Sequence, residues 1–497
     1  MTTPLHLFEL RLTPIDSQRF KALIVASTLG SNPESESTLP FWVGSKDWRK
    51  TVIKVLESSS GFKAKNFSNP GEQAWMVKAG ILSPEHLSFA PDYLARIGQA
   101  LFQALLPPNE PDETVRETFK AALREAERED VTLHLRLTFA ADSARRSRLA
   151  DYPWELIHDG TRFLLHRRVQ LSRYIAYDAV PPQPPLGDRL RVLLVSPRAS
   201  DVGQLSDAEP EAIRAGIAKA EIVSLDQLPT PTWRGLSTYL TETANPPQVL
   251  HFDGHGIFGK HCRACGHLNN STKVETCQSC GAPLPEAQGF LAFEDEQGKA
   301  EFVSARKLAS LVTDKGIALA VLSACQSGMA VTGESVFNGT AQQLIDADVP
   351  AVVAMQYSVR VREARDFAEQ FYRVLGQGES ALAALGEGRK WMDVEGNQWY
   401  RPVLYLRWQE NEAGQLFVTS NRKHGECQEF SPSITESTST SSNSRRAYYA
   451  RRVIQLEEEL AAVEADIESA PREVDRLRLE KAAEQLLEKI ERLRTKL

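Results

Sequence analysis

From Leu190 to Trp408 the sequence alternates short apolar runs with amphipathic stretches, and this alternation constrains the fold more than any other feature. The apolar runs have the composition of strands, and the stretches between them have the periodicity of helices. Strands that are apolar along their whole length are buried on both faces, so we predict an α/β domain with a mainly parallel sheet between two layers of helices. The predicted strands are LRVLLVS, AEIVSL, PQVLHFD, IALAVLSA, PAVVAMQ and PVLYLRW, and the predicted helices span 210–219, 232–243, 305–311, 334–345, 362–375 and 380–391.

A chain of 497 residues is too long for one hydrophobic core, and the remaining sequence suggests further parts. Residues 1–130 mix strand and helix signals and are predicted to form an α+β region of unknown role, whereas 131–430 hold the α/β domain and its leading strands. Residues 431–444 have ten Ser or Thr in fourteen positions, too polar to bury a core, which predicts a linker. In 445–497 apolar residues recur at spacings of three and four on both sides of Pro471, which predicts a helical hairpin.

Composition and charge exclude several classes of protein. The chain is 42% hydrophobic and 25% charged with a net charge of -7, so neither nucleic acid nor a membrane surface is an expected partner. The apolar runs are far shorter than the roughly 20 residues that cross a bilayer. Glu9 and Arg11 interrupt the first apolar stretch, which therefore does not read as a secretion signal. We expect a cytoplasmic protein without a membrane segment.

Two predicted strands end in residues that together suffice for acyl transfer. PQVLHFD runs into GHG and IALAVLSAC runs into QSG, which places His255 and Cys325 at the edge where open α/β sheets bind ligands. A cysteine thiolate attacks a carbonyl carbon, and an imidazole transfers the protons. The N–H groups of Gly256 and Cys325 are our candidates for stabilising the oxyanion, because Gly256 permits close approach.

Each of these two signals is weak when taken singly. A cysteine at a strand end is often a small buried hydrophobe, and a histidine beside glycine often belongs to a turn. Their joint placement favours catalysis, provided that the two strands are neighbours and bring His255 and Cys325 within hydrogen-bond reach.

Four of the six cysteines form two CxxC pairs, CRAC and CQSC, separated by eleven residues and each followed by glycine. This spacing predicts a structural zinc site, because two CxxC turns present four thiolates to one ion and leave no open position for catalysis. Disulfides are disfavoured in a reducing compartment, and a redox CxxC needs no second pair. The predicted ligands are Cys262, Cys265, Cys277 and Cys280.

The position of this zinc insert, residues 260–286, leads to a further expectation. Cys262 follows His255 by seven residues, so the insert should leave the sheet at the active-site edge. There it would form a wall of the substrate cleft or a docking surface. The alternative is a stabilised loop with no role in recognition.

Two other functional classes remain open from the residues alone. His251, Asp253 and His255 alternate along a predicted strand, so one face would present all three to a catalytic metal in a metallohydrolase. That interpretation lacks a further ligand and leaves Cys325 unexplained. The other class is a catalytically inactive scaffold that binds partners through the zinc insert and the C-terminal hairpin.

The segments HFDGHG and LSACQSG resemble the His-Gly and Ala-Cys motifs of caspase-like peptidases, most closely those of the CHAT family, relatives of separase and caspases. DYPWELIHDG and FLLHRRVQLSRY also resemble the segment that precedes the peptidase strands in CHAT proteins, so the resemblance covers about 131–408. It implies a caspase-hemoglobinase sandwich and a cysteine endopeptidase that cleaves a protein substrate. Cys325 would be the nucleophile, His255 the general acid and base, and Gly256 part of the oxyanion hole.

The resemblance is incomplete at the substrate pocket. Many metacaspases, which cut after Arg or Lys, carry Asp just before the Cys motif, where this chain has Leu322 and Ser323. A basic preference at the cleavage site is therefore not expected. We assign Asp253, Ser323 and Gln326 to the substrate pocket, with two alternatives for Asp253: that it orients His255 or that it caps a turn.

The C-terminal hairpin resembles the effector-associated adaptor domains that couple bacterial CHAT effectors to NTPase sensor proteins. This resemblance implies an effector peptidase of a bacterial conflict or programmed cell-death system, recruited through residues 445–497 by an adaptor or an NTPase sensor. Homo-oligomerisation through a coiled coil is the alternative for the same residues.

Overall fold

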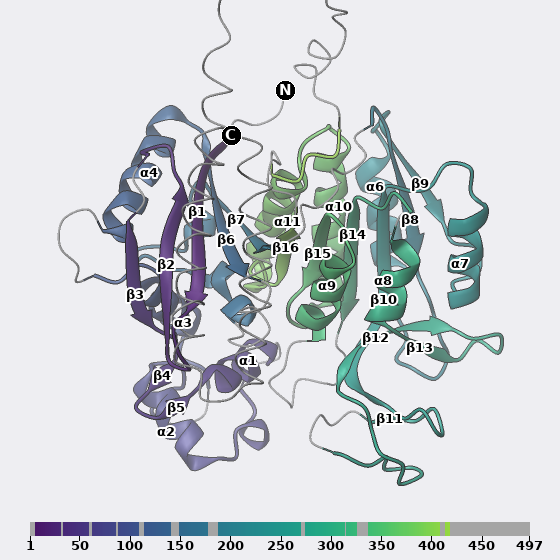
Figure 1. Cartoon of the computed structure of the whole chain (residues 1–497), viewed down its shortest axis with the longest axis horizontal. Coiled ribbons are helices and arrows are strands. Elements are labelled where there is room, and N and C mark those ends of the chain that lie inside the picture. Colours follow the sequence, from purple (N-terminus) through teal and green to yellow (C-terminus); the bar gives the residue numbers. More distant parts are fainter. Residues whose placement is uncertain are drawn as a thin grey trace, which may run out of the picture. The chain divides into compact units, whose positions relative to one another are not determined.

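One continuous sheet of 14 strands organises the computed structural model (Figure 1). The structure describes residues 5–30, 33–58, 62–85, 88–108, 114–140, 149–176, 187–269, 274–313, 315–325, 336–407 and 413–417, all within one compact unit. The predicted linker 431–444 and hairpin 445–497 lie outside these residues. In the part that is described, no helix has the length and hydropathy to span a membrane.

The order of strands brings the N-terminal region and the α/β domain into the same sheet. The main order is β9 (Val223–Gln227), β8 (Leu190–Val195), β10 (Val249–His261), β14 (Leu319–Cys325), β15 (Ala351–Met355), β16 (Pro402–Leu406), β7 (Val169–Ala176), β6 (Thr132–Ala140), β1 (Leu5–Pro14), β2 (Arg19–Ala26) and β3 (Glu34–Thr38). On the same side of β10 as β8, the second half of β10 pairs with β12 (Gln288–Glu294), which pairs with β13 (Ala300–Ser304). The end of β10 pairs with β11 (Leu268–Asn269), and a separate pair is formed by β4 (Trp42–Val43) and β5 (Lys46–Asp47).

Most neighbouring strands along this order are parallel, as predicted. They are parallel from β9 to β15 and again from β16 to β1. The two halves run in opposite directions because β15 and β16 pair antiparallel. The outer strands β2, β3, β12 and β13 are also antiparallel to their neighbours. The sheet is therefore mixed but mostly parallel at its centre, and β1 joins residues before 131 to it.

Helices cover both faces of the α/β half, which confirms the predicted sandwich. In β14, Leu319 and Val321 pack with one helical layer, while Ala320 and Leu322 pack with the other. The first layer contains α6 (Ala208–Ile217), α10 (Val361–Leu375) and α11 (Ala381–Gly396). The second layer contains α7 (Trp233–Glu242), α8 (Ala305–Val312) and α9 (Val336–Asp346). The N-terminal region contains α1 (Arg49–Glu57), α2 (Pro70–Lys78), α3 (Tyr93–Leu105) and α4 (Val115–Glu129).

One strand differs from its prediction in a way that matters for the site. β10 was expected to end near Asp253, but it continues to His261, so the prediction that His255 lies at the carboxyl end of its strand is wrong. The extension forms because the hairpin of β12 and β13 folds back, and residues 288–292 pair with 255–259. The sequence between these segments contains the four cysteines, whose insertion concealed the pairing.

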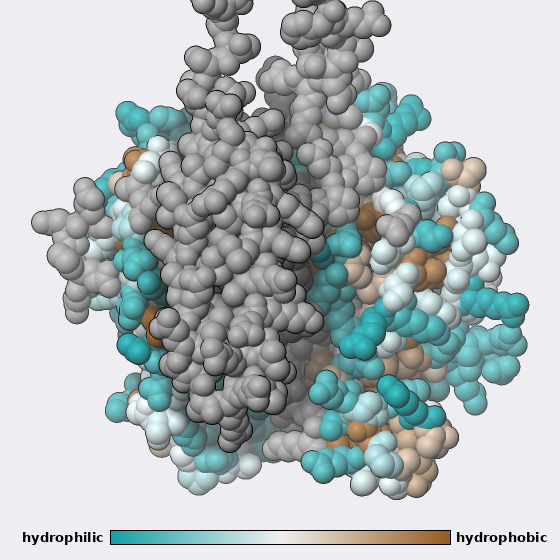
Figure 2. Space-filling view, in the orientation of Figure 1, coloured by the Kyte–Doolittle hydropathy of each residue, from teal (hydrophilic) through white to brown (hydrophobic). Residues whose placement is uncertain are grey.

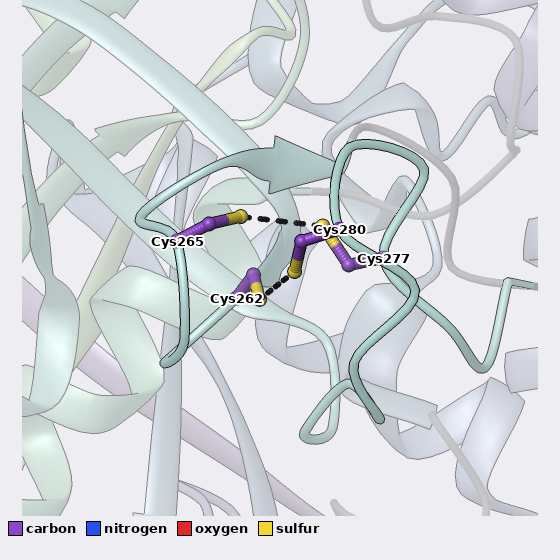
Figure 3. A group of neighbouring side chains, drawn as sticks. All are labelled: Cys262, Cys265, Cys277 and Cys280. Atoms are coloured by element: carbon purple, nitrogen blue, oxygen red, sulfur yellow. Dashed lines mark hydrogen bonds between the residues drawn. The ribbon is translucent and has the colours of Figure 1, made fainter.

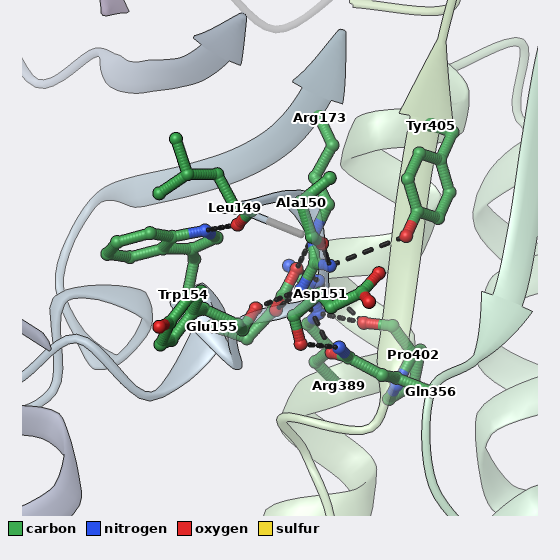
Figure 4. Close-up of polar contacts among 11 residues, drawn as sticks. Leu149, Ala150, Asp151, Trp154, Glu155, Arg173, Gln356, Arg389, Pro402 and Tyr405 are labelled. Carbon is green, nitrogen blue, oxygen red and sulfur yellow. Dashed lines mark hydrogen bonds and ion pairs between the residues drawn. The ribbon is translucent and has the colours of Figure 1, made fainter. Parts of the chain in front are cut away.

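A buried ion pair fixes the segment DYPWEL against the centre of the sheet (Figure 4). Arg173 of β7 and Glu155 of the short helix η3 (Trp154–Leu156) have no exposed side-chain surface and form a salt bridge. Arg173 also donates from Nη2 to Gln356 Oε1 at 2.9 Å and to the Tyr152 carbonyl at 3.1 Å. Burial opposes the charge of Arg173, but the carboxylate of Glu155 outweighs it and raises the pKa of the guanidinium. The network joins the leading strands to the end of β15.

Candidate active site

His255 and Cys325 lie side by side on neighbouring strands. β10 and β14 pair in parallel, and the two residues are Cα partners in their register. Neighbouring strands are about 4.8 Å apart, so the backbones of the two residues are adjacent across the ladder. Cys325 is the last residue of β14, as predicted.

The sheet opens next to His255 although β10 itself continues. Phe252 of β10 still pairs with Val195, the last residue of β8, whereas His255 pairs with Ala292 of β12. β10 therefore changes partners within three residues of the histidine. β8 and β14, the neighbours of β10 on its two sides, both end close to His255. His255 therefore lies at the edge formed by the ends of these two strands, although we had predicted that β10 itself ends there.

A backbone carbonyl sets the tautomer of His255. Nε2 of the ring lies 2.5 Å from the carbonyl oxygen of Gly203, in the loop between β8 and α6. A carbonyl oxygen only accepts hydrogen bonds, so Nε2 carries the proton. In the neutral ring the lone pair is then on Nδ1, so Nδ1 is the basic nitrogen of the ring.

Asp253 does not orient His255 directly and does not cap a turn. Its side chain is buried inside β10 and accepts hydrogen bonds from Ser196 Oγ at 2.7 Å and Arg198 Nη2 at 2.6 Å. Both donors follow the carboxyl end of β8. Asp253 therefore anchors the start of the loop that carries the carbonyl bound to His255.

Arg198 connects this anchor to the rest of the loop. Its Nη2 also lies 3.2 Å from the carbonyl oxygen of Ser206, and its backbone N–H donates to Glu294 Oε1 at 2.6 Å. The side chain of Arg198 thus connects both ends of the loop to β10, and the backbone N–H of Arg198 connects the loop to β12. Gly203 lies between the two tied ends and contacts His255.

We expect Arg198→Ala to lower kcat about 10- to 100-fold with a small change in KM, because the loop would no longer hold His255 in one orientation. Arg198→Lys should recover part of the loss, since a lysine ammonium can still pair with Asp253. Steady-state kinetics on a cleaved peptide measure both constants. Arg214→Ala, on the exposed side of α6, is the control and should match the wild type. A loss confined to KM would instead indicate that Arg198 binds substrate.

A second polar cluster lies on the same face of β10, under α6 and α10. Nδ1 of His251 is 2.8 Å from the Tyr372 hydroxyl, and its Nε2 is 3.2 Å from Glu209 Oε1. Burial is the main reason that the pKa of the Glu209 carboxyl is raised. Both nitrogens of His251 thus face groups from the helices.

The alternative of a catalytic metal site gains no support from this arrangement. His251 is directed to Glu209 and Tyr372, while Asp253 is bound by Arg198. Among the described residues, the group whose His, Cys, Asp and Glu ligand atoms gather around one point consists of the four cysteines.

The structure also places the other predicted site residues. Ser323 of β14 is the register partner of Asp253 and is buried, so these two pocket candidates lie together beneath the catalytic pair. Gly256 pairs with Leu291 of β12. Gln326, the third pocket candidate, lies outside the described residues.

The four predicted metal ligands converge from two turns (Figure 3). Their sulfur atoms lie within 4.8 Å of one another, and the pairs Cys262–Cys280 and Cys265–Cys277 are each separated by 3.6 Å. A disulfide would hold its sulfurs about 2.05 Å apart, whereas thiolates on one tetrahedral zinc stand roughly 3.8 Å apart. The group is therefore arranged to bind a metal ion and not as disulfides.

Hydrogen bonds to sulfur favour the ionisation of one member of the group, Cys277. Desolvation opposes the ionisation of Cys277, but hydrogen bonds from the backbone N–H groups of Cys280 and Ser279 outweigh it and lower the pKa to about 6. The side chain of Asn269 also donates to Cys277 Sγ, at 3.6 Å. Metal-binding cysteines are held as thiolates, so these donors favour the form that a metal requires.

Several residues around His255 were not found from the sequence. Ser196 and Arg198 follow β8, a strand end that the rule used for His255 and Cys325 would also have selected. Gly203 and Glu209 had no such signal, because their contacts depend on the path of the loop and on the docking of α6.

The comparisons with known proteins are as follows. A family model described as CHAT domain matches residues 95–411, and no curated protein matches. Two crystal structures of the separase–securin complex of Saccharomyces cerevisiae align with 13% and 12% identity, over 81% of this chain and 30% of that chain, with TM-scores of 0.39 and 0.35. A solved structure described as a protease aligns with 10% identity over 61% of this chain and 70% of that chain, with a TM-score of 0.35. This chain thus spans 30% of the separase chain that it matches.

The family model covers more than half of the chain, from α3 to the residues that follow β16. It includes His255, Cys325 and the four cysteines, together with the buried pair of Glu155 and Arg173 in the two upstream segments that carried the resemblance. The resemblance is therefore confirmed, and the chain belongs to the CHAT domain family.

Proposed function

We propose that the protein is a cysteine endopeptidase with Cys325 as nucleophile and His255 as general acid and base. The observation that carries the proposal is the register of β10 and β14, which makes the two residues direct partners on adjacent parallel strands. The hydrogen bond from His255 Nε2 to Gly203 supports it, because it puts the lone pair of the neutral ring on Nδ1, the nitrogen that we assign to proton transfer.

The chemistry requires two acyl transfers. His255 takes the proton of the Cys325 thiol, and the thiolate adds to the peptide carbonyl. The oxyanion is stabilised by the N–H groups of Gly256 and Cys325. His255 then gives a proton to the leaving amine, the C–N bond breaks, and a thioester remains. Water, deprotonated by His255, attacks this thioester, which releases the carboxylate product and the thiol.

We place the side chain of the substrate residue before the cleaved bond near Asp253 and Ser323, with Gln326 as the third wall. Asp253 is already bound by Ser196 and Arg198, so its charge is compensated within the protein. This supports the expectation that a basic residue is not preferred at this position.

The test is a comparison of new protein N-termini in cells that express the wild type or Cys325→Ala. New termini that depend on Cys325 and share residues around the cleaved bond would support the proposal. Absence of such termini, with the proposed adaptor or NTPase sensor co-expressed, would favour the inactive scaffold. Cleavage that survives in Cys325→Ala would favour a different nucleophile.

We further propose that the four cysteines bind one structural zinc ion. Four thiolates match the preference of zinc and complete a tetrahedral shell without an open position, so the metal supplies stability to the insert and not chemistry to the reaction. Cys262, Cys265, Cys277 and Cys280 would hold it.

Metal analysis of the purified chain should give about one zinc per molecule. Cys277→Ser should lose the zinc and make the insert sensitive to limited proteolysis between residues 262 and 280, because the two turns would no longer be held together. Ser279→Ala, in the same turn, keeps all four ligands and should retain the metal. A full zinc content in Cys277→Ser would contradict the assignment.

For the C-terminal residues 445–497 we propose recruitment by an adaptor or NTPase sensor protein within a bacterial conflict or cell-death system, with homo-oligomerisation as the second candidate. Deleting residues 431–497 should leave peptide hydrolysis within about twofold of the wild type and abolish recruitment, because the catalytic pair and its sheet lie before residue 423. Pull-down with the candidate partner and light scattering separate the two candidates.

A further inference from the structure

The sheet that contains His255 ends in an open edge at β13. β13 is the outermost strand on this side and pairs only with β12 in the part of the chain that the structure describes. Such an edge presents backbone donors and acceptors that can pair with another extended chain.

The direction in which these backbone groups point follows from the hydrogen bonds of the turn between β12 and β13. Asp295 N–H donates to the Lys299 carbonyl at 2.7 Å, which makes this a hydrogen-bonded pair. Hydrogen-bonded and non-bonded pairs alternate along an antiparallel ladder, so the N–H and C=O groups of Phe302 point away from β12. The neighbouring outward N–H, that of Ala300, donates to Asp201 Oδ1 at 2.7 Å, as the alternation requires.

A groove of about 540 Å³ lies along β12 and β13, next to this edge. Residues of the four-cysteine module, which is the insert 260–286, close it on one side. Phe302, which is half-buried, supplies apolar surface, Phe290 is buried beneath the groove, and Arg263, Gly266 and Pro285 line it from the module. Hydrophobic surface lies among hydrophilic residues in this region, at the lower right of Figure 2, where Figure 1 shows β11 and β12.

The groove lies on the same face of the sheet as the catalytic histidine. His255 is the cross-strand partner of Ala292, and Ala292 is the partner of Phe302, and such partners project to one face. A strand added beyond β13 would be three strand spacings from β10, about 14 Å, which roughly four residues of extended chain can bridge.

The charges of the groove add a second element of recognition. Glu301 and Lys307 face each other at 3.8 Å, and Asp295 accepts hydrogen bonds from the N–H groups of its own turn. Arg263 is exposed on the module, and among the described residues it has no recorded ion pair. An acidic residue would complement it.

We propose that the groove binds an extended segment of the protein substrate, which adds to β13 as a further strand. The segment pairs with the backbone of Phe302, places an apolar side chain on the ring of Phe302, and directs an acidic residue to Arg263. It lies about four residues or more from the cleaved bond. The inference rests on the proposed peptidase function, and it makes the four-cysteine module a wall of the substrate site.

The full chain with Cys325→Ala is screened against a library of random twelve-residue peptides, and enriched peptides are titrated by fluorescence polarisation. Adding Phe302→Pro removes the outward N–H of this residue without removing a hydrogen bond to β12, and should weaken the binding of the enriched peptides about fivefold or more. Phe302→Leu keeps the N–H and an apolar side chain, and is the matched control. Arg263→Glu, an exposed change that does not burden folding, should weaken peptides with an acidic residue.

The outcomes separate the groove from the catalytic proposal because binding is measured without the nucleophile. Enriched peptides that share an apolar and an acidic position and lose affinity in Phe302→Pro and Arg263→Glu support the groove. Enriched peptides that bind all variants equally, or no enrichment at all, overturn it. If the wild-type chain, which retains Cys325, does not cleave peptides, the proposed peptidase function is contradicted while the result on peptide binding still stands.

Discussion

Replacing His255 with alanine is expected to lower the rate of peptide hydrolysis roughly 100- to 10,000-fold, the contribution of a positioned general acid and base. His255 is the register partner of Cys325, and its ring is held by the Gly203 carbonyl, so no movement of the sheet is needed to bring the pair together. The rate is measured as kcat/KM on a peptide taken from the cleavage sites found in cells.

His6→Ala is the control for this experiment. His6 lies on β1, where its Nε2 is 3.2 Å from Glu129, and it should keep wild-type activity. The double variant His255→Ala and Cys325→Ala should be no less active than Cys325→Ala alone, because the two groups act as one unit. If His255→Ala kept more than about a tenth of the wild-type activity, a positioned acid and base could not be the role of this residue.

The α/β half of the fold could be predicted because its signals are local. Each apolar run and each amphipathic stretch between Leu190 and Leu406 reports its own structure through its periodicity, and strands buried on both faces indicate two helical layers. The cysteine module was also predictable, because two CxxC turns identify a metal site by spacing alone.

The remaining fold depends on pairings between distant segments. The extension of β10 exists only because β12 pairs with it after the insert. The strand direction reverses between β15 and β16 because the chain enters β16 from the opposite end of the sheet. β1 and β6 are parallel partners separated by more than a hundred residues. Nothing in the local pattern of these strands encodes their neighbours.

The same distinction applies to the site. His255 and Cys325 were found because each is followed by glycine near a strand end, at Gly256 and at Gly328. The contact of Arg198 with Asp253, by contrast, depends on a loop that folds back across β10. The loop in turn supplies the Gly203 carbonyl. Sequence reasoning thus found the reacting groups, and the structure adds the groups that orient them.

The largest loss of stability is expected from Arg173→Met. This change keeps a long apolar side chain but removes the direct partner of the buried Glu155 carboxylate, which then faces only the more distant Nη2 of Arg389 at 3.8 Å among the described residues. We expect it to lower the free energy of unfolding by about 3–5 kcal/mol. Gln356 Oε1 and the Tyr152 carbonyl also lose a donor. Urea denaturation, followed by the fluorescence of the buried Trp154 in the same segment, measures the change.

A double variant tests whether the loss comes from the unpaired carboxylate. Arg173→Met combined with Glu155→Leu removes both charges of the pair and should recover part of the stability, because a buried pair can be replaced by apolar side chains of similar volume. The recovery stays partial because the buried Arg389 loses its carboxylate neighbour and keeps its hydrogen bonds to the Pro402 carbonyl. The exposed pair of Lys120 and Glu117 on α4 is the control, and Lys120→Ala should change the free energy of unfolding by less than about 1 kcal/mol. A double variant as unstable as Arg173→Met would show that the hydrogen bonds to Gln356 and Tyr152, and not the ion pair, hold DYPWEL on the sheet.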